Sequence, residues 1–450
     1  MTSITLPARE ADVLLETDVV VCGGGPAGLG AALAAARTGA SVVLLERYGF
    51  LGGNFTAAAV GTVCGLYVRS APGSFDYAIG GVARAFVEEL VARGKAIGPY
   101  PFKETAVLLY VPWAAKRLAD HLVIEGPDSG NITLLLHALV SEVVVDPETG
   151  AVDGVVIASK QGPKVVRGRV VVDATGDADV AVAAGVPWIM GGPGERQFGS
   201  MQFFMQNVDI AAAMTAGLGA LSEAIAEHGG HLTRDGGAVI PTFRGGEVIG
   251  AMIRLTRDGA PLDATDLFDL TYGELEGRRR AEEAEVFLKE YMPGFADAFL
   301  ADTATQQGVR ETRHIVGRYT LTGDEVRAQA TFEDAVAVCA WPQEYHVSGR
   351  STDYVFLPDG ATYSIPFRVL LPSAGPPNLL VAGRCISADH HALASCRVMA
   401  PCMALGEAAG TAAALAVLDA RETSSDRIVL GSVDPGAVRT ELVARGAILP

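Results

Sequence analysis

Short apolar runs, a glycine turn and a helical pattern follow one another near the start of the chain. The runs at 17–22 and 41–46 are rich in β-branched residues and lack polar alternation, which is typical of strands buried on both faces. Between them lie a glycine turn and a small-residue stretch that suits a helix packed closely on a sheet. The pattern therefore predicts a strand, a turn, a helix and a second strand built as one βαβ unit.

The residues after the second predicted strand do not show the pattern of a simple crossover connection between parallel strands. Apolar residues recur at helical spacing over 79–95 and 111–125, and prolines separate these stretches from their surroundings. A strand at 132–137 follows, and the turn at 146–150 separates further β segments. Those segments are expected near 139–146, 151–160 and 164–172. The pattern predicts an insertion, and then a β-meander that ends in a small-residue turn at 173–177.

The pattern of hydrophobic and polar residues changes from about residue 190 onward. The run at 197–208 predicts a strand of a separate sheet, and helices are expected over 209–228 and 273–292. A strand and glycine turn at 378–384 and a small-residue helix at 402–418 then bring the chain back to the first unit, before a short docked C-terminal helix. At 450 residues the chain exceeds one hydrophobic core, so two domains are expected.

The glycine turn carries the first chemical signal. Gly23, Gly25 and Gly28 form GxGxxG, and Glu46 closes the second strand about 20 residues on. Gly23 permits the turn, Gly25 lets the backbone approach a pyrophosphate, and Gly28 allows close helix–strand contact. An anion would then bind the free N–H groups at the helix start. The motif predicts dinucleotide binding, against the alternative of a glycine-rich structural turn, and by itself does not separate FAD from NAD.

Composition and charge narrow the classes of partner. The net charge of -17 reflects an excess of acidic over basic residues, so nucleic acid is not an expected partner. No apolar run approaches the ~20 residues of a membrane span, and the first 16 residues lack the apolar core of a secretory signal. The six cysteines have no CxxC or secreted-domain spacing. We therefore expect a cytoplasmic protein without a membrane span.

Several further blocks, taken together, carry a family resemblance. They read GGGPAGLGAALAAARTG, ERYGFLGGNFT, DATGDADVA, GVRETRHIVGRYTL and NLLVAGRCISADHHALASCRVMAPCMALGEAAGTAAALA. This combination resembles the FAD-dependent oxidoreductase family of the glutathione-reductase-like flavoprotein fold. It is also distantly similar to the fumarate reductase and succinate dehydrogenase flavoproteins, which share the FAD domain and carry an inserted domain over the substrate.

The resemblance implies a domain organisation and a cofactor site. The fold is expected to be α/β, with a discontinuous Rossmann-like FAD-binding domain of parallel sheet plus β-meander over 1–190 and 370–450, and an inserted α+β substrate or lid domain over 191–369. The FAD site implied by the family pattern comprises Gly23, Gly25, Pro26, Ala27, Gly28, Glu46, Arg47, Gly52, Gly53, Asn54, Thr56, Val140, Gly176, Asp177, Gly383, Arg384 and Met403. The helix from about Met403 would direct its positive end at the flavin.

The candidates for catalysis follow the 383–384 turn. His390 and His391 are expected near the flavin face, where a histidine of near-neutral pKa could take a substrate proton; the alternative is a loop histidine bonded to backbone. Arg397 could bind a substrate carboxylate or donate a proton, against a structural salt bridge. Arg313, with Arg310 and His314, would be a second anchor unless Glu311 pairs with them. No cluster has metal-ligand spacing, so no metal is expected.

These features favour one reaction class and leave rivals open. The 52–56 stretch holds no redox cysteine pair, which disfavours disulfide reduction. The sequence also lacks a second GxGxxG motif, so a separate nicotinamide-binding domain is not expected. We predict an FAD-dependent dehydrogenase or reductase that transfers a hydride between the flavin and a small polar or anionic molecule at CH–CH or CH–OH. Oxygen, a quinone or a redox protein would be the external electron partner, and a homo-oligomer is allowed. The alternatives are a flavoprotein monooxygenase and a non-catalytic FAD subunit of an electron-transfer complex.

Overall fold

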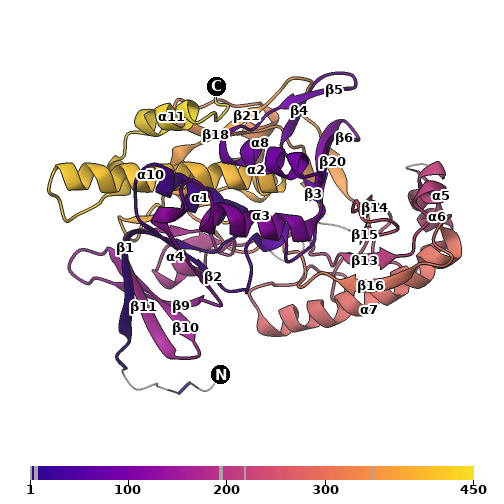
Figure 1. The fold of residues 1–450 in the computed structure, drawn as a ribbon, viewed down its shortest axis with the longest axis horizontal. Helices are drawn as coiled ribbons and strands as arrows, with labels where there is room; N and C mark the ends of the chain where they lie inside the picture. Colours follow the sequence, from indigo (N-terminus) through magenta and orange to yellow (C-terminus); the bar gives the residue numbers. More distant parts are fainter. Residues whose placement is uncertain (1–2, 5–8, 192–195, 217–218, 347–348) are drawn as a thin grey trace.

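A mixed sheet forms the centre of the fold (Figure 1). The computed structural model describes residues 3–4, 9–191, 196–216, 219–346 and 349–450. The sheet has the order β8-β2-β1-β11-β10-β9, and β22 also pairs with β11. Its strands are β1 (Asp12–Cys22), β2 (Val42–Glu46), β8 (Ile132–Leu136), β9 (Leu139–Val145), β10 (Val152–Ser159), β11 (Gly162–Asp173) and β22 (Leu379–Val381). Strands β8, β2, β1, β11 and β22 run parallel, as the predicted βαβ unit requires, and the β9–β10–β11 meander is antiparallel.

Two small-residue helices pack on this sheet and on each other. They are α1 (Pro26–Arg37) and α10 (Met399–Glu422). A Cβ added at Gly406 would lie 1.9 Å from the Ala27 carbonyl oxygen, and one added at Gly410 would lie 2.1 Å from the Ala31 carbonyl oxygen. Only glycine permits so close an approach of two backbones. The glycines and alanines of both helices are thus explained by a contact between segments almost 400 positions apart in sequence.

Helix α10 is the one described helix long and apolar enough to span a membrane by length and composition. In its most apolar window, 78% of the residues are buried inside the fold. A core helix has the same composition.

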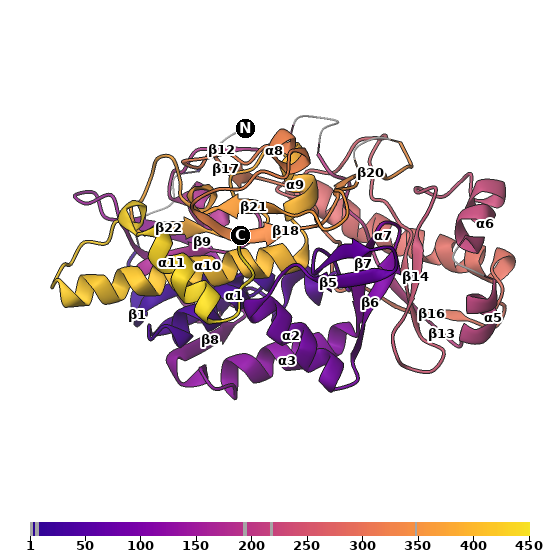
Figure 2. The same ribbon diagram turned by 90° about the horizontal axis from the view of Figure 1, so that it is seen from above.

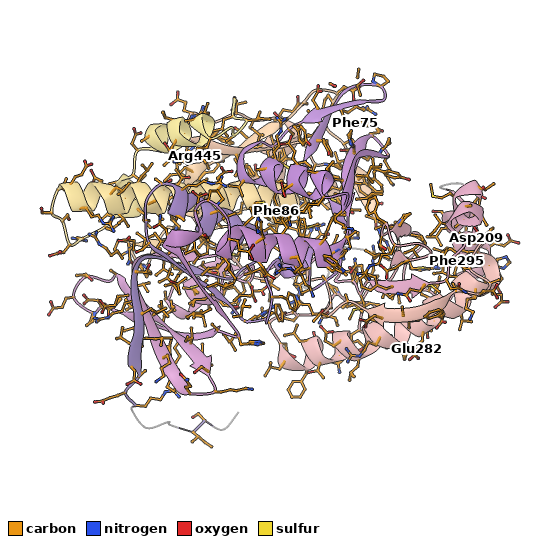
Figure 3. The ribbon with its side chains drawn as sticks, viewed as in Figure 1. Phe75, Phe86, Asp209, Glu282, Phe295 and Arg445 are labelled. Carbon is orange, nitrogen blue, oxygen red and sulfur yellow. The ribbon has the colours of Figure 1, made fainter. Side chains whose placement is uncertain are left out.

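The predicted insertion lies between β2 and β8. It contains the two expected helices, α2 (Gly81–Ala92) and α3 (Pro112–Ile124), with a short 3-10 turn η1 (Gly53–Phe55) before them. Two small antiparallel sheets accompany them. Their strands are β3 (Thr62–Val63), β4 (Tyr67–Ala71), β5 (Ser74–Tyr77), β6 (Ala96–Phe102) and β7 (Thr105–Tyr110). Phe86 of α2 is buried near the middle of the molecule and meets Phe55 edge-on at 5.4 Å between ring centroids (Figure 3).

A buried carboxyl group joins α2 to α10. Glu407 of α10 accepts a hydrogen bond from the Val82 N–H at 2.9 Å and is 3% exposed. Burial raises the pKa of Glu407 from its ordinary value of 4.5 to about 7, against the opposing effect of that hydrogen bond. The folded state therefore holds the proton more tightly than the unfolded chain does. Its contribution to stability is complete below about pH 4.5 and is lost as the pH rises through about 7.

The substitution Glu407→Gln is expected to flatten this pH dependence, because glutamine keeps an acceptor but does not titrate. One pKa unit corresponds to ~1.4 kcal/mol, so the wild-type free energy of unfolding should fall by about 3 kcal/mol across this window through Glu407 alone. Urea unfolding of both apoproteins at about pH 5 and about pH 8 measures the difference. An equal fall in both proteins would contradict the assignment.

A second unit lies at the right of Figure 1. It is built on a four-stranded antiparallel sheet of order β14-β15-β13-β16, and side chains of α5, α6 and α7 join the same hydrophobic core. The bounds are β13 (Phe203–Gln206), α5 (Ile210–Thr215), α6 (Ala220–His228), β14 (Ala238–Pro241), β15 (Val248–Ala251), α7 (Leu267–Tyr291) and β16 (Phe299–Thr303). Its apolar side chains, such as Phe203 and Phe287, form a core separate from that of the central sheet. The predicted α/β class with an additional α+β unit is confirmed.

Element boundaries in this unit differ from the predicted ones. The strand expected over 197–208 covers only Phe203–Gln206, and the helix expected over 209–228 is two helices, α5 and α6. Helix α7 begins at Leu267 because the Asp266 carboxylate accepts hydrogen bonds from the N–H groups of Phe268 and Asp269. These caps act over two or three residues, so apolar periodicity alone did not reveal them.

Several segments between 314 and 371 pack beside α10, whereas residues 349–352 hydrogen-bond to the second unit. The elements of this part of the chain are β17 (His314–Ile315), which pairs with β12 (Trp188–Ile189), then α8 (Gly323–Arg327), β18 (Ala335–Cys339), β19 (Gln343–Tyr345), β20 (Asp353–Val355) and β21 (Tyr363–Pro366). Figure 2 shows β18 and β21 beside α10, with α9 (His390–Cys396) above them and α11 (Pro435–Ala444) at the C-terminal end. Their buried side chains, Val338 and Ile365 among them, belong to the same cluster as those of α1 and α10. The unit with its own core is therefore shorter than the predicted 191–369 insertion.

Candidate functional site

One large cavity of about 990 Å³ lies where the central sheet, the insertion and the second unit meet. Its walls come from the carboxyl ends of β1, β2 and β11, from β6 and β7, from the start of α10, and from β14, β15, α5 and α6. Ligands of open α/β sheets bind at the carboxyl ends of the strands. The cavity is therefore the candidate site.

The glycine turn forms one end of the cavity. Gly23, Gly25, Pro26 and Ala27 line it, and Gly25 is the N-cap of α1 with no side-chain hydrogen bond to the helix. The first-turn N–H groups of α1 therefore have no competing side-chain cap, as an anion site requires. Gly28 faces away from the cavity, and a Cβ there would lie 1.7 Å from the Gly23 carbonyl oxygen. Gly28 closes the turn, and Gly25 leaves it open to a ligand.

Glu46 lies beside this turn at the end of β2. Its carboxylate accepts hydrogen bonds from the Gly24 N–H at 2.7 Å and the Tyr48 N–H at 2.9 Å, and the residue is 4% exposed. Burial raises the pKa of Glu46, and these two hydrogen bonds oppose the rise. Arg47 and Val140 also line the cavity here. Backbone N–H groups thus hold the Glu46 carboxylate at the position where the acidic residue of a dinucleotide-binding βαβ unit binds the ribose.

The loop after β2 contributes two of the four residues that the family pattern suggested. Gly53 and Asn54 line the cavity, and the Asn54 side-chain amide donates a hydrogen bond to the Val309 carbonyl at 2.9 Å. Gly52 and Thr56 do not line it, because the Thr56 hydroxyl is buried and donates to the Leu51 carbonyl at 2.7 Å. Gly52 has φ +109°, a left-handed backbone conformation that favours glycine. Gly52 and Thr56 therefore set the shape of the loop without lining the cavity.

A partly buried ion pair closes the same end from the opposite side. The Asp177 carboxylate accepts hydrogen bonds from Arg384 and from the Thr312 hydroxyl, both at 2.6 Å. Burial acts to raise the pKa of Asp177, but Arg384 and Thr312 outweigh it, so the pKa lies below its ordinary value. Gly176, Asp177, Gly383 and Arg384 all line the cavity. The predicted turns at 173–177 and 378–384 thus meet here.

The start of α10 also reaches the cavity. Val398 is its N-cap and makes no side-chain cap, and Val398, Met399 and Cys402 line the cavity. Met403 does not, because its carbonyl packs against Gly30 of α1. The positive end of this helix therefore lies four residues earlier than the pattern suggested.

Three residues expected to be catalytic lie outside the cavity lining. His390 pairs with Glu311, with Nδ1 at 2.9 Å and 3.0 Å from the two carboxylate oxygens, and the Glu311 side chain is fully buried. His391 is exposed and meets the Tyr345 hydroxyl at 3.2 Å. Arg313 pairs with Asp179 and donates to the Asp177 carbonyl at 2.9 Å. These side chains brace neighbouring loops.

Two other arginines do enter the cavity, and we call Arg310 and Arg397 the arginine pair. Arg310 donates to the Phe198 carbonyl at 2.7 Å, and Arg397 donates to the Glu344 carbonyl at 3.3 Å. The Arg397 Nε atom is buried and, within the described part of the chain, has no hydrogen-bond partner, while the side chain is 7% exposed.

Glu344 is the carboxylate closest to the pair, 4.0 Å from Arg397. It also accepts hydrogen bonds from the Tyr354 hydroxyl at 3.0 Å and from the Trp341 indole at 3.3 Å, and contacts His346 at 3.0 Å. Burial acts to raise its pKa, but His346 and the arginine pair hold the pKa of Glu344 well below its usual range. This carboxylate is thus already shared among several donors.

The nearby carboxylate does not fully compensate the positive charge of the arginine pair. Burial, followed by the repulsion of Arg397 and Arg234, lowers the pKa of Arg310 to about 9, and Glu344 only partly compensates. A lowered pKa in a guanidinium means that its positive charge is destabilised in this environment. An organic anion bound here would supply the missing charge.

Sequence reasoning missed Glu344, Trp341 and Tyr354. A charged residue inside the aromatic stretch WPQEYH was the available signal, but their common position depends on the pairing of β19 with β20.

A comparison with protein families completes the description of the site. A family model described as FAD dependent oxidoreductase matches residues 18–429. The chain belongs to this family. It is therefore an enzyme whose cofactor is FAD, and the uncapped start of α1, the backbone-held Glu46 and the space at Gly25 fit that cofactor. A bound flavin supplies hydride or single-electron chemistry.

Solved structures give matches of low identity. A geranylgeranyl bacteriochlorophyll reductase-like protein from Thermoplasma acidophilum matches with a TM-score of 0.45 and 15% identity, over 96% of this chain and 83% of that one. The p-nitrophenol 4-monooxygenase PnpA from Pseudomonas putida gives 0.45 and 13%, over 96% and 85%. The flavin-dependent monooxygenase PieE, in complex with FAD and substrate, gives 0.38 and 14%, over 68% and 52%. No curated protein sequence matches the chain.

Proposed function

We propose that this oxidoreductase is a dehydrogenase or reductase that transfers a hydride between FAD and a small organic anion, at a CH–CH or CH–OH bond. The observation that carries the proposal is the arginine pair, which lies in the same cavity as the glycine turn and, among the described residues, contacts a carboxylate, Glu344, that is already shared. Buried cations in an apolar cavity favour an anionic ligand.

Each residue set has a role in this proposal. The start of α1 binds the pyrophosphate, Glu46 binds the ribose, and the Asp177–Arg384 pair orients the loops around it. Arg310 and Arg397 bind the substrate anion. The second unit covers the cavity and excludes water, which strengthens these charge interactions. His390 and His391 have no direct role, and Arg313 braces the 177–179 turn.

The remaining expectations complete the proposal. The chain is a member of the glutathione-reductase-like group, distantly related to fumarate reductase flavoproteins, with 1–190 and 370–450 as its FAD-binding domain. The covering domain is the part of 191–369 that has its own core. Electrons pass to or from oxygen, a quinone or a redox protein, and the enzyme works in the cytoplasm, alone or as a homo-oligomer.

Anaerobic reduction of the bound flavin tests the reaction. Hydroxy acids and saturated carboxylates, which can give up a hydride, are mixed with the oxidised FAD-loaded enzyme, and bleaching of the flavin is recorded. We expect bleaching by at least one such anion, slowed by deuterium at the reacting carbon. Bleaching by NAD(P)H alone, with incorporation of labelled O₂ into a product, would instead identify a monooxygenase. Flavin that only exchanges electrons with another protein would identify an electron-transfer subunit.

A further inference from the structure

We infer that the substrate is an amphipathic organic anion, whose charged group binds the arginine pair and whose apolar part occupies a chamber under the second unit. This inference rests on the proposed function and specifies its substrate class. It comes from the part of the cavity that neither the cofactor residues nor the arginine pair occupy.

The apolar chamber is the stretch of cavity between the four-stranded sheet and helices α5 and α6. Three secondary elements and the segment after α7 line it with aliphatic and aromatic side chains: Ile210, Met214, Leu221, Val239, Ile240 and Phe295. Figure 3 shows Phe295 near Asp209, at the outer end of the unit and far from Phe86 in the middle of the molecule.

Phe295 and Ile240 belong to hydrophobic cores, whereas other side chains of the chamber leave apolar surface open. Phe295 and Ile240 are buried, at 0% and 6% exposure, but Met214 is 55% exposed and still lines the cavity. Val239 and Ile210 are half-buried. Apolar surface left in contact with water is unfavourable, and covering it with an apolar ligand gains free energy. A small polar substrate would leave this surface wet.

Arg234 connects the chamber to the arginine pair. Its guanidinium donates to the Ala251 carbonyl at the end of β15, and to the Thr352 hydroxyl, both at 3.3 Å. Thr352 lies 3.2 Å from His346, which in turn contacts Glu344. Because Arg234, Ala251, Thr352 and Glu344 all line the one cavity, a single ligand has continuous access to both ends. The charge and the apolar wall are thus presented to the same molecule.

A chain-length series of straight monocarboxylates measures the apolar contribution. Acetate, butanoate, hexanoate and octanoate are titrated into the FAD-loaded enzyme without oxygen, and the shift of the oxidised flavin spectrum before any bleaching reports binding. A buried methylene is worth ~0.8 kcal/mol, and 1.4 kcal/mol is tenfold in affinity. We expect the dissociation constant to fall by about fourfold per methylene until the chamber is filled.

Two tryptophan variants on α5 assign the effect to the chamber. Ala213 lines the cavity, so Ala213→Trp should weaken octanoate binding by at least about tenfold, a loss of only two methylene contributions, and leave acetate binding unchanged. Ala211 is exposed on the same helix and does not line the cavity. Ala211→Trp should therefore reproduce the wild-type series.

The outcomes separate this inference from the proposed function. A dissociation constant that is independent of chain length, or tighter binding of dicarboxylates than of monocarboxylates of equal length, would overturn the amphipathic substrate and leave the anion site intact. Ala211→Trp and Ala213→Trp with the same effect would also overturn it. If FAD binds but no carboxylate of any length perturbs it, the proposed anion site itself fails.

Discussion

Replacing Arg310 by methionine is expected to slow substrate-dependent flavin reduction strongly without weakening the fold. The guanidinium lies in the cavity, donates to the Phe198 carbonyl, and has a pKa lowered to about 9 by burial and by neighbouring arginines. Because the folded-state pKa is the lower one, the charged guanidinium costs the folded state free energy at every pH below about 9, including neutral pH.

Methionine fills similar space without the charge. Because the lowered pKa shows that the Arg310 charge is disfavoured in the folded protein, the melting temperature of Arg310→Met should equal or exceed that of the wild type. Losing a charge-assisted contact to the substrate costs ~3–4 kcal/mol when two such bonds are made. The rate of flavin reduction at low substrate should therefore fall by between about one hundredfold and one thousandfold.

Stopped-flow reduction and thermal unfolding of the same preparation measure both effects. His391→Ala is the matched control on the other side of the site, because His391 is exposed and does not line the cavity. It should reduce at the wild-type rate. Wild-type reduction in Arg310→Met, or equal losses in Arg310→Met and His391→Ala, would remove the arginine pair from the site.

The second large effect is expected at the glycine turn, where two alanine substitutions should act differently. A Cβ at Gly25 would meet only Gly53, at 3.8 Å, so Gly25→Ala should leave the stability of the apoprotein unchanged. The new methyl group would project toward the space for the pyrophosphate and should weaken FAD binding by about one hundredfold or more, since overpacking costs ~1–3 kcal/mol or above.

Gly28→Ala should instead destabilise the apoprotein itself. Its Cβ would lie 1.7 Å from the Gly23 carbonyl oxygen, a backbone atom that cannot move without opening the turn. Gly130→Ala is the control, because a Cβ there meets nothing within 4 Å. Flavin fluorescence titration and unfolding of the apoproteins separate the two effects. Wild-type FAD affinity in Gly25→Ala would contradict the assignment of this turn to the pyrophosphate.

The sequence was most informative where one element and its neighbour along the chain determine the structure. The strand, turn and helix around Gly23 are local, and their buried β-branched and small residues predict them directly. The α10 helix was also predicted, although its start at Met399 depends on contacts with α1 that sequence spacing does not reveal.

The catalytic candidates were harder because their direction depends on distant partners. His390 stands at the first position of α9, and the Asp389 cap fixes the start of that helix. Its side chain then meets Glu311, which is 79 positions away in sequence. The sequence suggested Arg310, Arg313 and His314 as a second anchor, but no local pattern tells that Arg310 lines the cavity while Arg313 pairs with Asp179.

A crystal structure of the enzyme with FAD and a monocarboxylate tests the central claim most directly. We expect the FAD pyrophosphate against Gly25 and the first turn of α1, and the carboxylate within hydrogen-bonding distance of both Arg310 and Arg397. FAD bound away from the glycine turn, or a carboxylate that contacts neither arginine of the pair, would contradict the account.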